Sequence, residues 1–515
     1  MSNPLKIPML LGLALAIALI FPAHSASLSD KQAEARTVRH FLSVQSHPPE
    51  LWNFLKEMPK GGDLHNHLSG AIYAESMIGW ASDDGLCVDD KTLSLMPPPC
   101  NEAHIAVSVA QHDPLLYRKM VDAWSMRNLA VSGQSGHDHF FDSFDKFDLA
   151  GHHRTGDMLA EVTSRAAAGH VSYLELMLTP AFPEIARAAT SAVRLADFAQ
   201  MHRTIEQNGL AEAVKVAMLK LTDSETKRRE IQHCDTALPD PGCTVTVRYL
   251  YQVLRGLPTD TVFAQMLLGF ELASIDTRVV GLNLVMPEDA LVPMQDFSSH
   301  MRMLDYLHRY YPNVHITLHA GELTPGLVPP EGLRFHIRDS IAIGHAERIG
   351  HGVAIMQEEN APALLQRMAH DKIMVEICLT SNDGILNVRG GQHPLATYLK
   401  QGVPIALATD DEGVSRSEMT QEYFKAVEEQ HLSYRQLKAM ARNSLQYAFL
   451  EGAPLWLDFE RRRAVNACSA DLRKVSLRGV SNRPALACRR YLQQNPRAEL
   501  QWKLETSLSE FERKQ

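Results

Sequence analysis

The 515-residue sequence lacks the features by which several protein classes are recognised from composition. Its net charge of −9 comes without an extended basic run, so the chain shows no electrostatic footprint for nucleic acid or for an anionic membrane. It contains no internal repeat, no low-complexity segment and no long apolar run beyond its first residues. No glycine-rich phosphate loop follows the first predicted strand. These absences favour a large globular protein that acts on a small molecule.

The first residues are typical of a cleaved secretory signal. Lys6 supplies a positive start, residues 7–21 form an apolar run, and residues 23–27 form a small-residue cleavage zone. The run is shorter than the about 20 residues that cross a bilayer comfortably, and no cysteine follows it to carry a lipid. We therefore expect residues 1–26 to be removed and the mature protein to be periplasmic or secreted, without a membrane anchor. An uncleaved anchor is the less favoured alternative.

Cysteine is scarce, with seven residues, but six of them fall into three close pairs. Outside the reducing cytoplasm such pairs form disulfides, and among the many connectivities that six cysteines allow we expect the local pairing. The pairs are Cys87 with Cys100, Cys234 with Cys243, and Cys468 with Cys488. The seventh cysteine, Cys378, lies in an apolar run and is expected to be a buried thiol rather than a nucleophile or a ligand.

Short apolar, β-rich runs alternate with helical stretches through most of the chain, which indicates parallel βαβ units of an α/β fold. Eight such runs predict a (β/α)8 barrel of the TIM type over residues 58–455, with the active site at the carboxyl ends of the strands. An open doubly wound sheet is the alternative, and the missing phosphate loop argues against it. The predicted strands are residues 62–67, 171–178, 213–221, 279–285, 314–319, 348–352, 373–378 and 404–408.

Three further segments surround the predicted barrel. Residues 27–57 predict an N-terminal helical lead-in, with helices at 30–44 and 49–57. Residues 71–169 form an insertion after the first strand, which we expect to lie over the catalytic face. Residues 456–515 predict a C-terminal helical extension, whose arginine-rich helices are expected to be solvated and packed on the outside of the barrel.

Histidines and carboxylates fall at the predicted strand ends, where a barrel carries its active site. His65 and His67 are two apart in a strand and therefore point to the same face. His319 ends the fifth predicted strand, and Asp410 with Asp411 follows the eighth. Each of these residues alone has a plain structural explanation, such as a core histidine or a helix cap. Together, three imidazoles and a carboxylate match the ligands of a divalent metal such as Zn2+, with one position left for water.

A metal held in this way lowers the pKa of bound water to about 7. The chemistry then needs a proton donor for the atom that receives electrons and a base that orients the hydroxide. Glu322, just beyond the fifth strand, suits the donor role, and His351, between two glycines on the sixth strand, suits the base. Asp410 and Asp411 are adjacent and diverge, so that one can bind the metal while the other faces the substrate.

These motifs, in this order, resemble those of the adenosine deaminase family, and the secreted branch that includes the adenosine deaminase-related growth factors is the most similar. They are Met58-Pro59-Lys60-Gly61-Gly62 before His65-x-His67, His319-Ala320-Gly321-Glu322, Arg348-Ile349-Gly350-His351-Gly352, Thr380-Ser381-Asn382 and Thr409-Asp410-Asp411. The similarity covers roughly residues 58–450 in motif order. It implies a metal-bearing (β/α)8 barrel that hydrolyses the 6-amino group of adenosine to give inosine and ammonia.

The resemblance also implies a role for each site residue. Four residues become the ligands of one Zn2+ per chain: His65, His67, His319 and Asp410. Glu322 protonates purine N1, His351 with Asp410 orients the hydroxide for attack at C6, and Asp411 hydrogen-bonds purine N7. The implied partners are a purine nucleoside, adenosine or 2'-deoxyadenosine, and water as the second substrate.

Four positions depart from the family pattern. Ser69 stands where ordinary members carry an aspartate that contacts the ribose, so its change leaves adenine or another aminopurine as an alternative substrate. Met286 replaces a glycine whose backbone N–H faces purine N3; methionine keeps that N–H but adds bulk to this part of the substrate pocket. Leu379 and Glu412 replace prolines beside the site, and we expect them to tune its shape.

A non-catalytic secreted binding or growth-factor-like protein is an alternative of a different class. It is disfavoured because such a protein is expected to have lost a metal ligand or the proton donor, and this chain keeps all of them. The sequence leaves the oligomeric state open, a homo-oligomer included, and it leaves the role of the insertion open as well.

Overall fold

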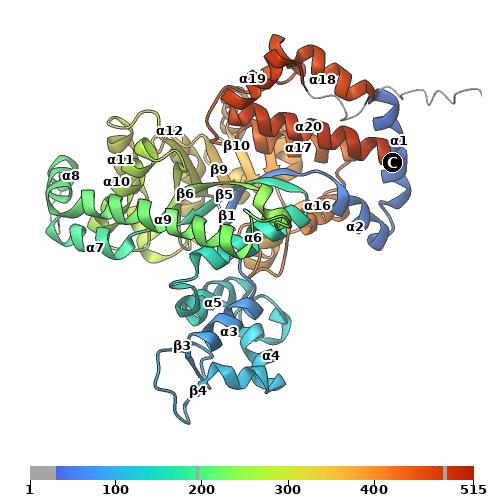
Figure 1. Ribbon diagram of the computed structural model, residues 1–515. Helices are drawn as coiled ribbons and strands as arrows, with labels where there is room; N and C mark the ends of the chain where they lie inside the picture. The colour runs from blue at the N-terminus through green and yellow to red at the C-terminus, as the bar shows by residue number, and fades with distance from the viewer. Residues whose placement is uncertain (1–29, 193–196, 479–483) are drawn as a thin grey trace, which may run out of the picture.

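The computed structural model describes residues 30–192, 197–478 and 484–515, and the predicted signal peptide lies outside the described residues. Its centre is an eight-stranded parallel sheet in which each strand pairs with the next along the chain (Figure 1). The sheet closes into a barrel where Asn66 of the first strand bridges Asp410 after the last. The strands are β1 (Gly61–His67), β5 (Val171–Leu178), β6 (Thr246–Leu254), β7 (Val279–Val285), β8 (His315–Ala320), β9 (Arg348–His351), β10 (Met374–Ile377) and β11 (Ile405–Leu407). The predicted (β/α)8 fold is confirmed.

One predicted strand is wrong. Residues 213–221 lie inside helix α9 (Ala211–Ile231), and the third barrel strand is β6 instead. Ala217 and Leu221 are buried and four residues apart, with more exposed residues between them, which is the period of a helix face and not the alternation of a strand. β6 is rich in the β-branched and aromatic residues that favour strands, and our sequence analysis overlooked it.

Helices cover the outside of the barrel (Figure 1), and the main hydrophobic core lies between them and the strands. The outer helices include α6 (Thr155–Ala168), α9, α10 (Thr259–Ile275), α11 (Leu291–His308), α12 (His336–Ala342), α13 (Ala361–Asp371), α15 (Leu395–Gln401) and α17 (Tyr434–Gln446). Further helices follow β5, β10 and β11: α7 (Phe182–Ala189), α8 (Phe198–Ile205), α14 (Leu379–Leu386) and α16 (Met419–Glu428). The loops at the carboxyl ends of the strands are therefore free to carry functional residues.

The insertion after β1 forms a lobe that touches the loops at the carboxyl ends of the strands. Its elements lie together below the barrel in Figure 1: α3 (Ala74–Asp83), α4 (Pro114–Ala123), α5 (Gly136–Gly151) and a sheet of β2 (Cys87–Asp89), β3 (Leu95–Met96) and β4 (His104–Ala106). The Met126 N–H donates to Val414 O after β11 (2.8 Å), and His137 pairs with Asp289 after β7 (2.9 Å). Helix α6, inside the predicted insertion, instead packs against β5 and α9 as part of the barrel wall.

The two ends of the described chain pack together on the barrel. Helix α1 (Asp30–Val44) lies beside α20 (Pro496–Lys514) and precedes α2 (Pro48–Glu57) (Figure 1). In α20, Leu500 and Leu504 are buried in one cluster with Tyr173 of β5 and Met374 of β10. The last helix is therefore a part of the barrel's packing and not a loosely attached tail.

The C-terminal extension is not helical throughout, although Arg461, Arg463, Arg489 and Arg490 are exposed as the sequence predicted. The extension begins with an antiparallel pair of strands, β12 (Trp456–Asp458) and β13 (Arg463–Ala464), before α18 (Asn466–Arg478) and α19 (Leu486–Gln494). Within the arginine run, the Arg462 guanidinium lies over the Phe459 ring, 4.0 Å from its centre, so this arginine packs on an aromatic face.

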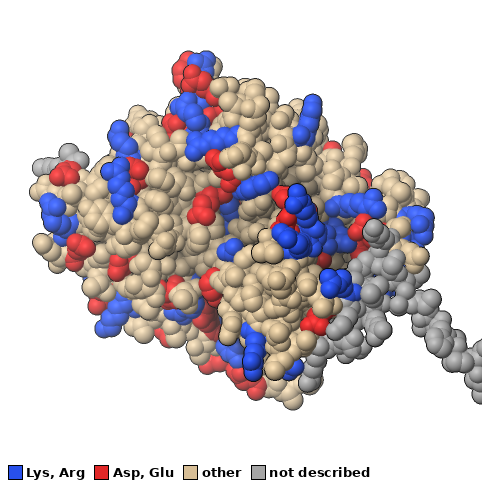
Figure 2. All heavy atoms as spheres, turned by 90° about the horizontal axis from the view of Figure 1, so that it is seen from above, with Lys and Arg blue, Asp and Glu red and all other residues tan. Residues whose placement is uncertain are grey.

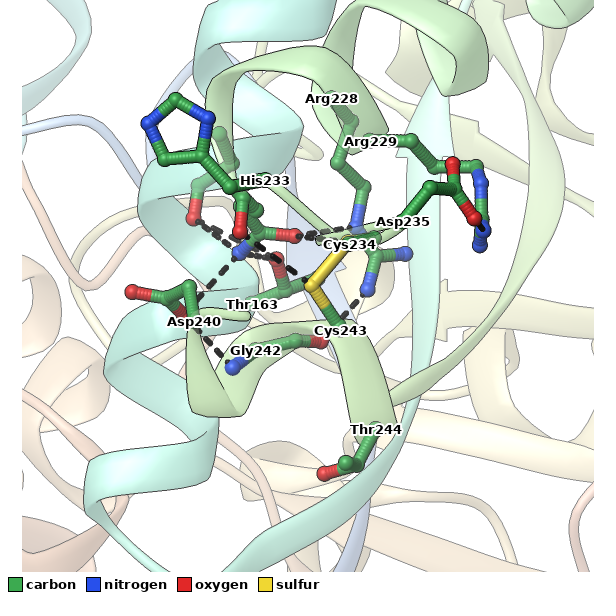
Figure 3. Close-up of a disulfide and its surroundings, with 12 residues drawn as sticks. Thr163, Arg228, Arg229, His233, Cys234, Asp235, Asp240, Gly242, Cys243 and Thr244 are labelled. Carbon is green, nitrogen blue, oxygen red and sulfur yellow. Dashed lines mark hydrogen bonds and ion pairs between the residues drawn. A yellow bond between two sulfur atoms is a disulfide. The ribbon is translucent and has the colours of Figure 1, made fainter. Parts of the chain in front are cut away.

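The six paired cysteines form three disulfides with the local pairing that the sequence favoured. Figure 3 shows Cys234–Cys243, which ties the end of α9 to the turn before β6. Beside it, the Arg228 guanidinium donates to Gly242 O (2.6 Å), so a buried cation supports the same turn. Cys378 is a buried free thiol.

Charges of both signs are interspersed over the face of the molecule shown in Figure 2. This distribution agrees with the absence of an extended basic run in the sequence. Within the described ranges, no helix has the combined length and apolar character that a bilayer crossing requires.

Candidate metal and catalytic site

Four side chains from three strands converge at the carboxyl end of the barrel. His65 and His67 project from the end of β1, His319 from β8, and Asp410 from the segment after β11. One ligand atom from each lies within 4.8 Å of the others. The His319 Nε2 atom is 3.0 Å from Nε2 of His65 and 3.2 Å from Nε2 of His67. The structure therefore brings the four predicted metal ligands together.

Each of the three imidazoles has an oxygen acceptor on its other ring nitrogen. An acceptor at Nδ1 fixes the ring proton there and leaves the Nε2 lone pair free to bind a metal. The pairs are His65 Nδ1 with Glu376 Oε2 (2.6 Å), His67 Nδ1 with Gln252 Oε1 (2.8 Å) and His319 Nδ1 with Asn283 Oδ1 (2.9 Å). All three Nε2 lone pairs therefore point at one shared position.

This donor set fits a divalent cation. Three lone pairs this close repel each other unless a cation lies between them. Zinc bound tetrahedrally to imidazoles would hold the nitrogens roughly 3.3 Å apart, close to the observed distances. Asp410 Oδ1 lies 3.2 Å from His67 Nε2, is buried, and has no hydrogen-bond donor among the residues that the structure describes. An unpartnered buried carboxylate oxygen beside three imidazoles is what a fourth ligand would present.

A network of buried charges lies behind His65. Glu376, the partner of His65, accepts from Arg348 Nε (2.6 Å), and Arg348 Nη2 donates to Glu175 (2.6 Å). Burial opposes ionisation of Glu376, but Arg348 and His65 outweigh it and lower the pKa of this carboxyl. The Phe449 N–H donates to Glu175 (2.7 Å) and completes the network. The orientation of one predicted metal ligand is thus set by charges inside the barrel.

Glu322 lies next to this centre, where burial favours its protonated form. One ligand atom each of Glu322, His351 and Asp410 lies within 4.8 Å of the others. Burial, reinforced by the charges of Asp410 and Glu288, raises the pKa of Glu322 well above its ordinary value. Glu288 also accepts the backbone N–H of Glu322 (2.8 Å) and so fixes the loop. Glu322 Oε1 has no hydrogen-bond partner within the described part of the chain.

His351 ends β9 with its ring buried beside the imidazoles of His65 and His319, whose centres are 4.9 and 5.0 Å away. Burial lowers the pKa of His351 to about 3, so the ring is neutral. Its Nδ1 is 3.0 Å from Asn382 Nδ2. Its Nε2 is buried without a partner among the described side chains, which leaves this nitrogen available to a ligand.

Asp411 follows Asp410, and the two carboxyl side chains are close enough to interact; their divergence stays a prediction. The carboxylate of Asp411 lies against Gly70, where a Cβ would come within 1.6 Å of Asp411 Oδ1, so a side chain at position 70 would displace this carboxylate. Burial and the neighbouring charge of Asp410 raise the pKa of Asp411 well above its ordinary value, although His67 opposes this. Oδ1 of Asp411 is buried and unpartnered within the described ranges.

The family model described as "Adenosine deaminase" matches residues 110–454.

This chain belongs to the adenosine deaminase family.

The match begins after β1, so it is the structure that places His65 and His67 with the other site residues. The resemblance found in the sequence is confirmed for the family, while membership of the growth-factor branch stays a prediction.

Curated relatives match part of the chain. An adenosine deaminase of Klebsiella pneumoniae is 40% identical over 137 residues, which are 26% of this chain and 38% of the relative. An adenosine deaminase of Serratia proteamaculans is 39% identical over 136 residues, with the same coverage. The matched part of the chain thus spans 38% of the length of these relatives.

Solved structures share the fold at lower identity. An ADAL–IMP complex has a TM-score of 0.51 and 21% identity, covering 78% of this chain and 94% of that one. An N6-mAMP deaminase from Arabidopsis has a TM-score of 0.51 and 22% identity, covering 78% and 96%. Identities this low show a common fold and nothing about substrates.

The positions that depart from the family pattern have definite places in this structure. Ser69 is half-buried in the turn after β1, and Leu379 is buried at the start of α14. Glu412 pairs with Arg165 of α6 (2.9 Å) and so ties the loop after β11 to the barrel wall. The predicted effect of these residues on the shape of the site stays untested.

Met286 and two other site residues adopt left-handed backbone conformations. The φ angles are +85° at Met286, +67° at His351 and +60° at Asp410. Residues other than glycine rarely adopt such angles, and they concentrate at functional sites. At position 286 the backbone has the conformation that glycine favours. The carbonyl of Met286 accepts two hydrogen bonds from Arg255, at 3.2 and 3.1 Å.

Sequence analysis assigned no role to the residues that orient the site. Gln252, Asn283, Arg348 and Glu376 lie on strands, and Glu288 lies in the loop after β7. Glu376 gave the clearest signal, because it is a carboxylate inside a predicted buried strand, where an unpaired charge is costly. Asn382 was quoted as part of a motif without a role.

A shallow groove of about 580 Å3 lies at the opposite, amino end of β8 and β9, lined in part by His308, His315, His345 and Glu347. His315 pairs with Glu347 (2.7 Å), and the rings of His308 and His345 are stacked 4.1 Å apart. These histidines are occupied with one another and with a carboxylate. The groove therefore does not compete with the carboxyl-end site as the catalytic centre.

Proposed function

We propose that this protein is a zinc-dependent aminohydrolase that converts adenosine, and 2'-deoxyadenosine, to inosine and ammonia. The observation that carries the proposal is one convergence: three imidazole Nε2 atoms and Asp410 face a single position, and Glu322 and His351 lie beside Asp410. Buried atoms of Glu322, His351 and Asp411 have no partner among the described residues. A zinc ion there would lower the pKa of its water to about 7 and make a nucleophile available at neutral pH.

The protonation states of the two buried carboxyls suit a purine. Purine N1 and N7 both carry lone pairs, so a side chain that contacts either atom must donate a hydrogen bond. Burial raises the pKa values of Glu322 and Asp411 and so favours the protonated form of each carboxyl. Glu322 would pass its proton to N1, which makes C6 more electrophilic, while Asp411 would hold N7. His351 with Asp410 would hold the attacking oxygen on the C6 side.

The arginines around the site favour a nucleoside over a nucleotide. A 5'-phosphate binds free guanidinium or ammonium groups, but three arginines here are already committed to acceptors. Arg255 donates to His319 O and Met286 O, Arg165 pairs with Glu412, and Arg416 pairs with Glu75. Adenine or another aminopurine is the second candidate, because Ser69 offers the sugar no carboxylate.

Secretion or export to the periplasm is part of the proposal. Three disulfides support it, since such bonds persist in oxidising compartments. A binding or growth-factor-like protein without turnover is less favoured, because the set of converging side chains is complete. The oligomeric state stays open.

The proposal is tested by following the ultraviolet absorbance of adenosine with the purified protein, with and without a strong zinc chelator. Adenine and AMP are run in parallel. We expect chelator-sensitive conversion of adenosine to inosine and little change of the other two. Turnover of adenine alone would keep the chemistry and change the substrate. A zinc-loaded protein that turns over none of them would contradict the proposal.

A further inference from the structure

We infer that Asn382 and His393 hold His351 in the tautomer that carries its proton on Nε2. His351 then donates a hydrogen bond to the attacking oxygen and does not take a proton from it. The inference revises the base role that the sequence suggested, and it rests on the proposed function for its consequence. It follows from the direction of three hydrogen bonds, beginning at a backbone group whose direction is fixed.

The first bond fixes the tautomer of His393. The backbone N–H of Leu395 lies 3.1 Å from His393 Nδ1. A backbone N–H can only donate, so His393 Nδ1 must carry a lone pair. The ring is then neutral, and its one proton is on Nε2.

The second bond fixes the orientation of the Asn382 amide. His393 Nε2 lies 3.2 Å from Asn382 Oδ1, so the imidazole donates and the amide oxygen accepts. The opposite orientation would place the amide NH2 against the N–H of His393. Both side chains are buried, so a lost hydrogen bond would not be replaced by bulk water.

The third bond fixes the tautomer of His351. With its oxygen turned to His393, Asn382 presents its NH2 to His351 Nδ1 at 3.0 Å. His351 Nδ1 therefore accepts, and the neutral ring carries its proton on Nε2. Glu322 Oε1 is 3.6 Å from the same Nδ1, too far for a hydrogen bond. A protonated Glu322 would in any case be another donor toward this nitrogen.

The Nε2–H of His351 is the end of this series of hydrogen bonds that is left for a ligand. It is buried without a partner in the described part of the molecule, and its ring lies among the imidazoles of His65 and His319. A fixed donor there would hold the attacking oxygen by one of its lone pairs and stabilise the negative charge that it brings to C6. In this tautomer Nε2 has no lone pair with which to accept a proton. Asn382 and His393 are thus positioning residues that act through His351.

The Asn382→Asp variant distinguishes a donor role of His351 from a base role. A carboxylate has nearly the same shape as the amide but accepts hydrogen bonds from both His393 and His351. It would draw the proton of His351 to Nδ1 and leave a lone pair on Nε2. We expect kcat to fall about 100-fold, as when a fixed donor is lost, with KM for adenosine and bound zinc nearly unchanged. If His351 is a base, the variant would keep or raise kcat, and that result would overturn the inference.

Two variants of His393 provide a matched control, because neither reverses the direction of the hydrogen bonds. His393→Gln keeps an NH2 that can donate to Asn382 Oδ1, so we expect kcat close to that of the parent. His393→Leu removes this donor, and we expect an intermediate loss. Equal losses in the two variants would count against the relay.

Neutron diffraction of the deuterated, zinc-loaded protein reads the tautomer directly and needs no turnover. We expect a deuteron on Nε2 of His351 and of His393, with none on either Nδ1. A deuteron on His351 Nδ1 would overturn the inference. If the parent protein fails to deaminate any purine, the proposed function fails, and the diffraction result still decides the tautomer.

Discussion

Two buried polar clusters lie within the barrel and differ in how completely their hydrogen bonds are satisfied. The cluster of Glu175, Arg348 and Glu376 is fully paired: each side-chain nitrogen and oxygen has a partner at 3.0 Å or less. The cluster at the carboxyl end leaves buried atoms of Glu322, His351, Asp410 and Asp411 unpartnered among the described residues.

The difference teaches how to tell a structural network from a binding site. Burying a polar atom without a partner costs about 1–3 kcal/mol, so a fold retains several such atoms together only where a ligand supplies the missing contacts. A fully paired network has no contact left to offer. We therefore expect mutations in the carboxyl-end cluster to remove function with little loss of stability. Mutations in the paired cluster should instead lower the free energy of unfolding.

Glu322→Gln should have the largest effect. The amide keeps the shape of the side chain but cannot pass a proton to N1, so we expect kcat to fall about 10,000-fold, the upper range for general acid catalysis. Zinc content and the free energy of unfolding should stay close to the parent values. Steady-state kinetics with metal analysis checks this.

The control is Glu331→Gln, which changes an exposed carboxylate nine residues away and should leave kcat unchanged. A Glu322→Gln variant with parental kcat would remove the proton donor from our mechanism. A Glu322→Gln variant that unfolds would show that Glu322 stabilises the fold, contrary to the distinction between the two clusters.

Arg348→Met tests the paired cluster. Removing the guanidinium leaves Glu175 and Glu376 as two buried charges without their shared partner, and breaking a buried ion pair in this way costs about 3–5 kcal/mol. Urea unfolding of the metal-free protein measures the loss. Arg367→Met, at an exposed arginine, is the control. Parental stability of the Arg348 variant would show that the paired cluster is not structural.

Much of the fold and of the candidate site could be predicted from the sequence because the signals are local. The apolar runs at seven strands and the alternation of His65 with His67 lie in short stretches, and a barrel brings strand ends together without further information. The failure at residues 213–221 is also local. Alternating apolar residues there suggested a strand, although their burial follows the helical period of α9.

The partners of the site residues could not be predicted, because they depend on the register between strands. Glu376 meets His65 across the barrel, 311 positions along the chain, and no local pattern encodes that meeting. The direction of the Asn382 amide depends on the backbone N–H of Leu395, through His393. The tautomer of a histidine can therefore be assigned only from a three-dimensional structure, even where every residue type is known.

Gly70→Ala should have a smaller effect than Glu322→Gln or Arg348→Met, and the effect should be confined to the carboxyl-end cluster. The new Cβ would lie within 1.6 Å of Asp411 Oδ1, so the carboxylate must move. A displacement of about 1 Å at a substrate contact can cost 100-fold, and we expect a loss of that order in kcat/KM. Gly79→Ala is the matched control, because a Cβ there meets nothing within 4 Å. Equal kinetics for both variants would show that Asp411 does not contact the substrate.

Of the residues tested here, Glu358 is expected to have the smallest effect on activity. Its Oε2 is buried and unpartnered within the described ranges, but Glu358 belongs to none of the groups of converging ligand atoms there, and its Oε1 accepts the N–H of Ile337 at the start of α12. Burial raises the pKa of Glu358 from 4.5 to about 7, although the backbone N–H groups of Ile337 and Arg338 oppose this. Because Glu358 lies outside the group of converging side chains, its unpartnered oxygen should affect stability and not activity.

The sign of the effect follows from proton binding. Between pH 4.5 and about 7 the folded chain holds a proton on Glu358 that the unfolded chain has released, so stability falls as pH rises through this interval. Glu358→Gln should remove a pH-dependent change in stability on the order of 3 kcal/mol across this interval, measured by urea unfolding at several pH values, and leave kcat unchanged. A variant with parental pH dependence but reduced kcat would place Glu358 in the catalytic cluster, and an isolated unpartnered oxygen would then mark function as well as a convergent set does.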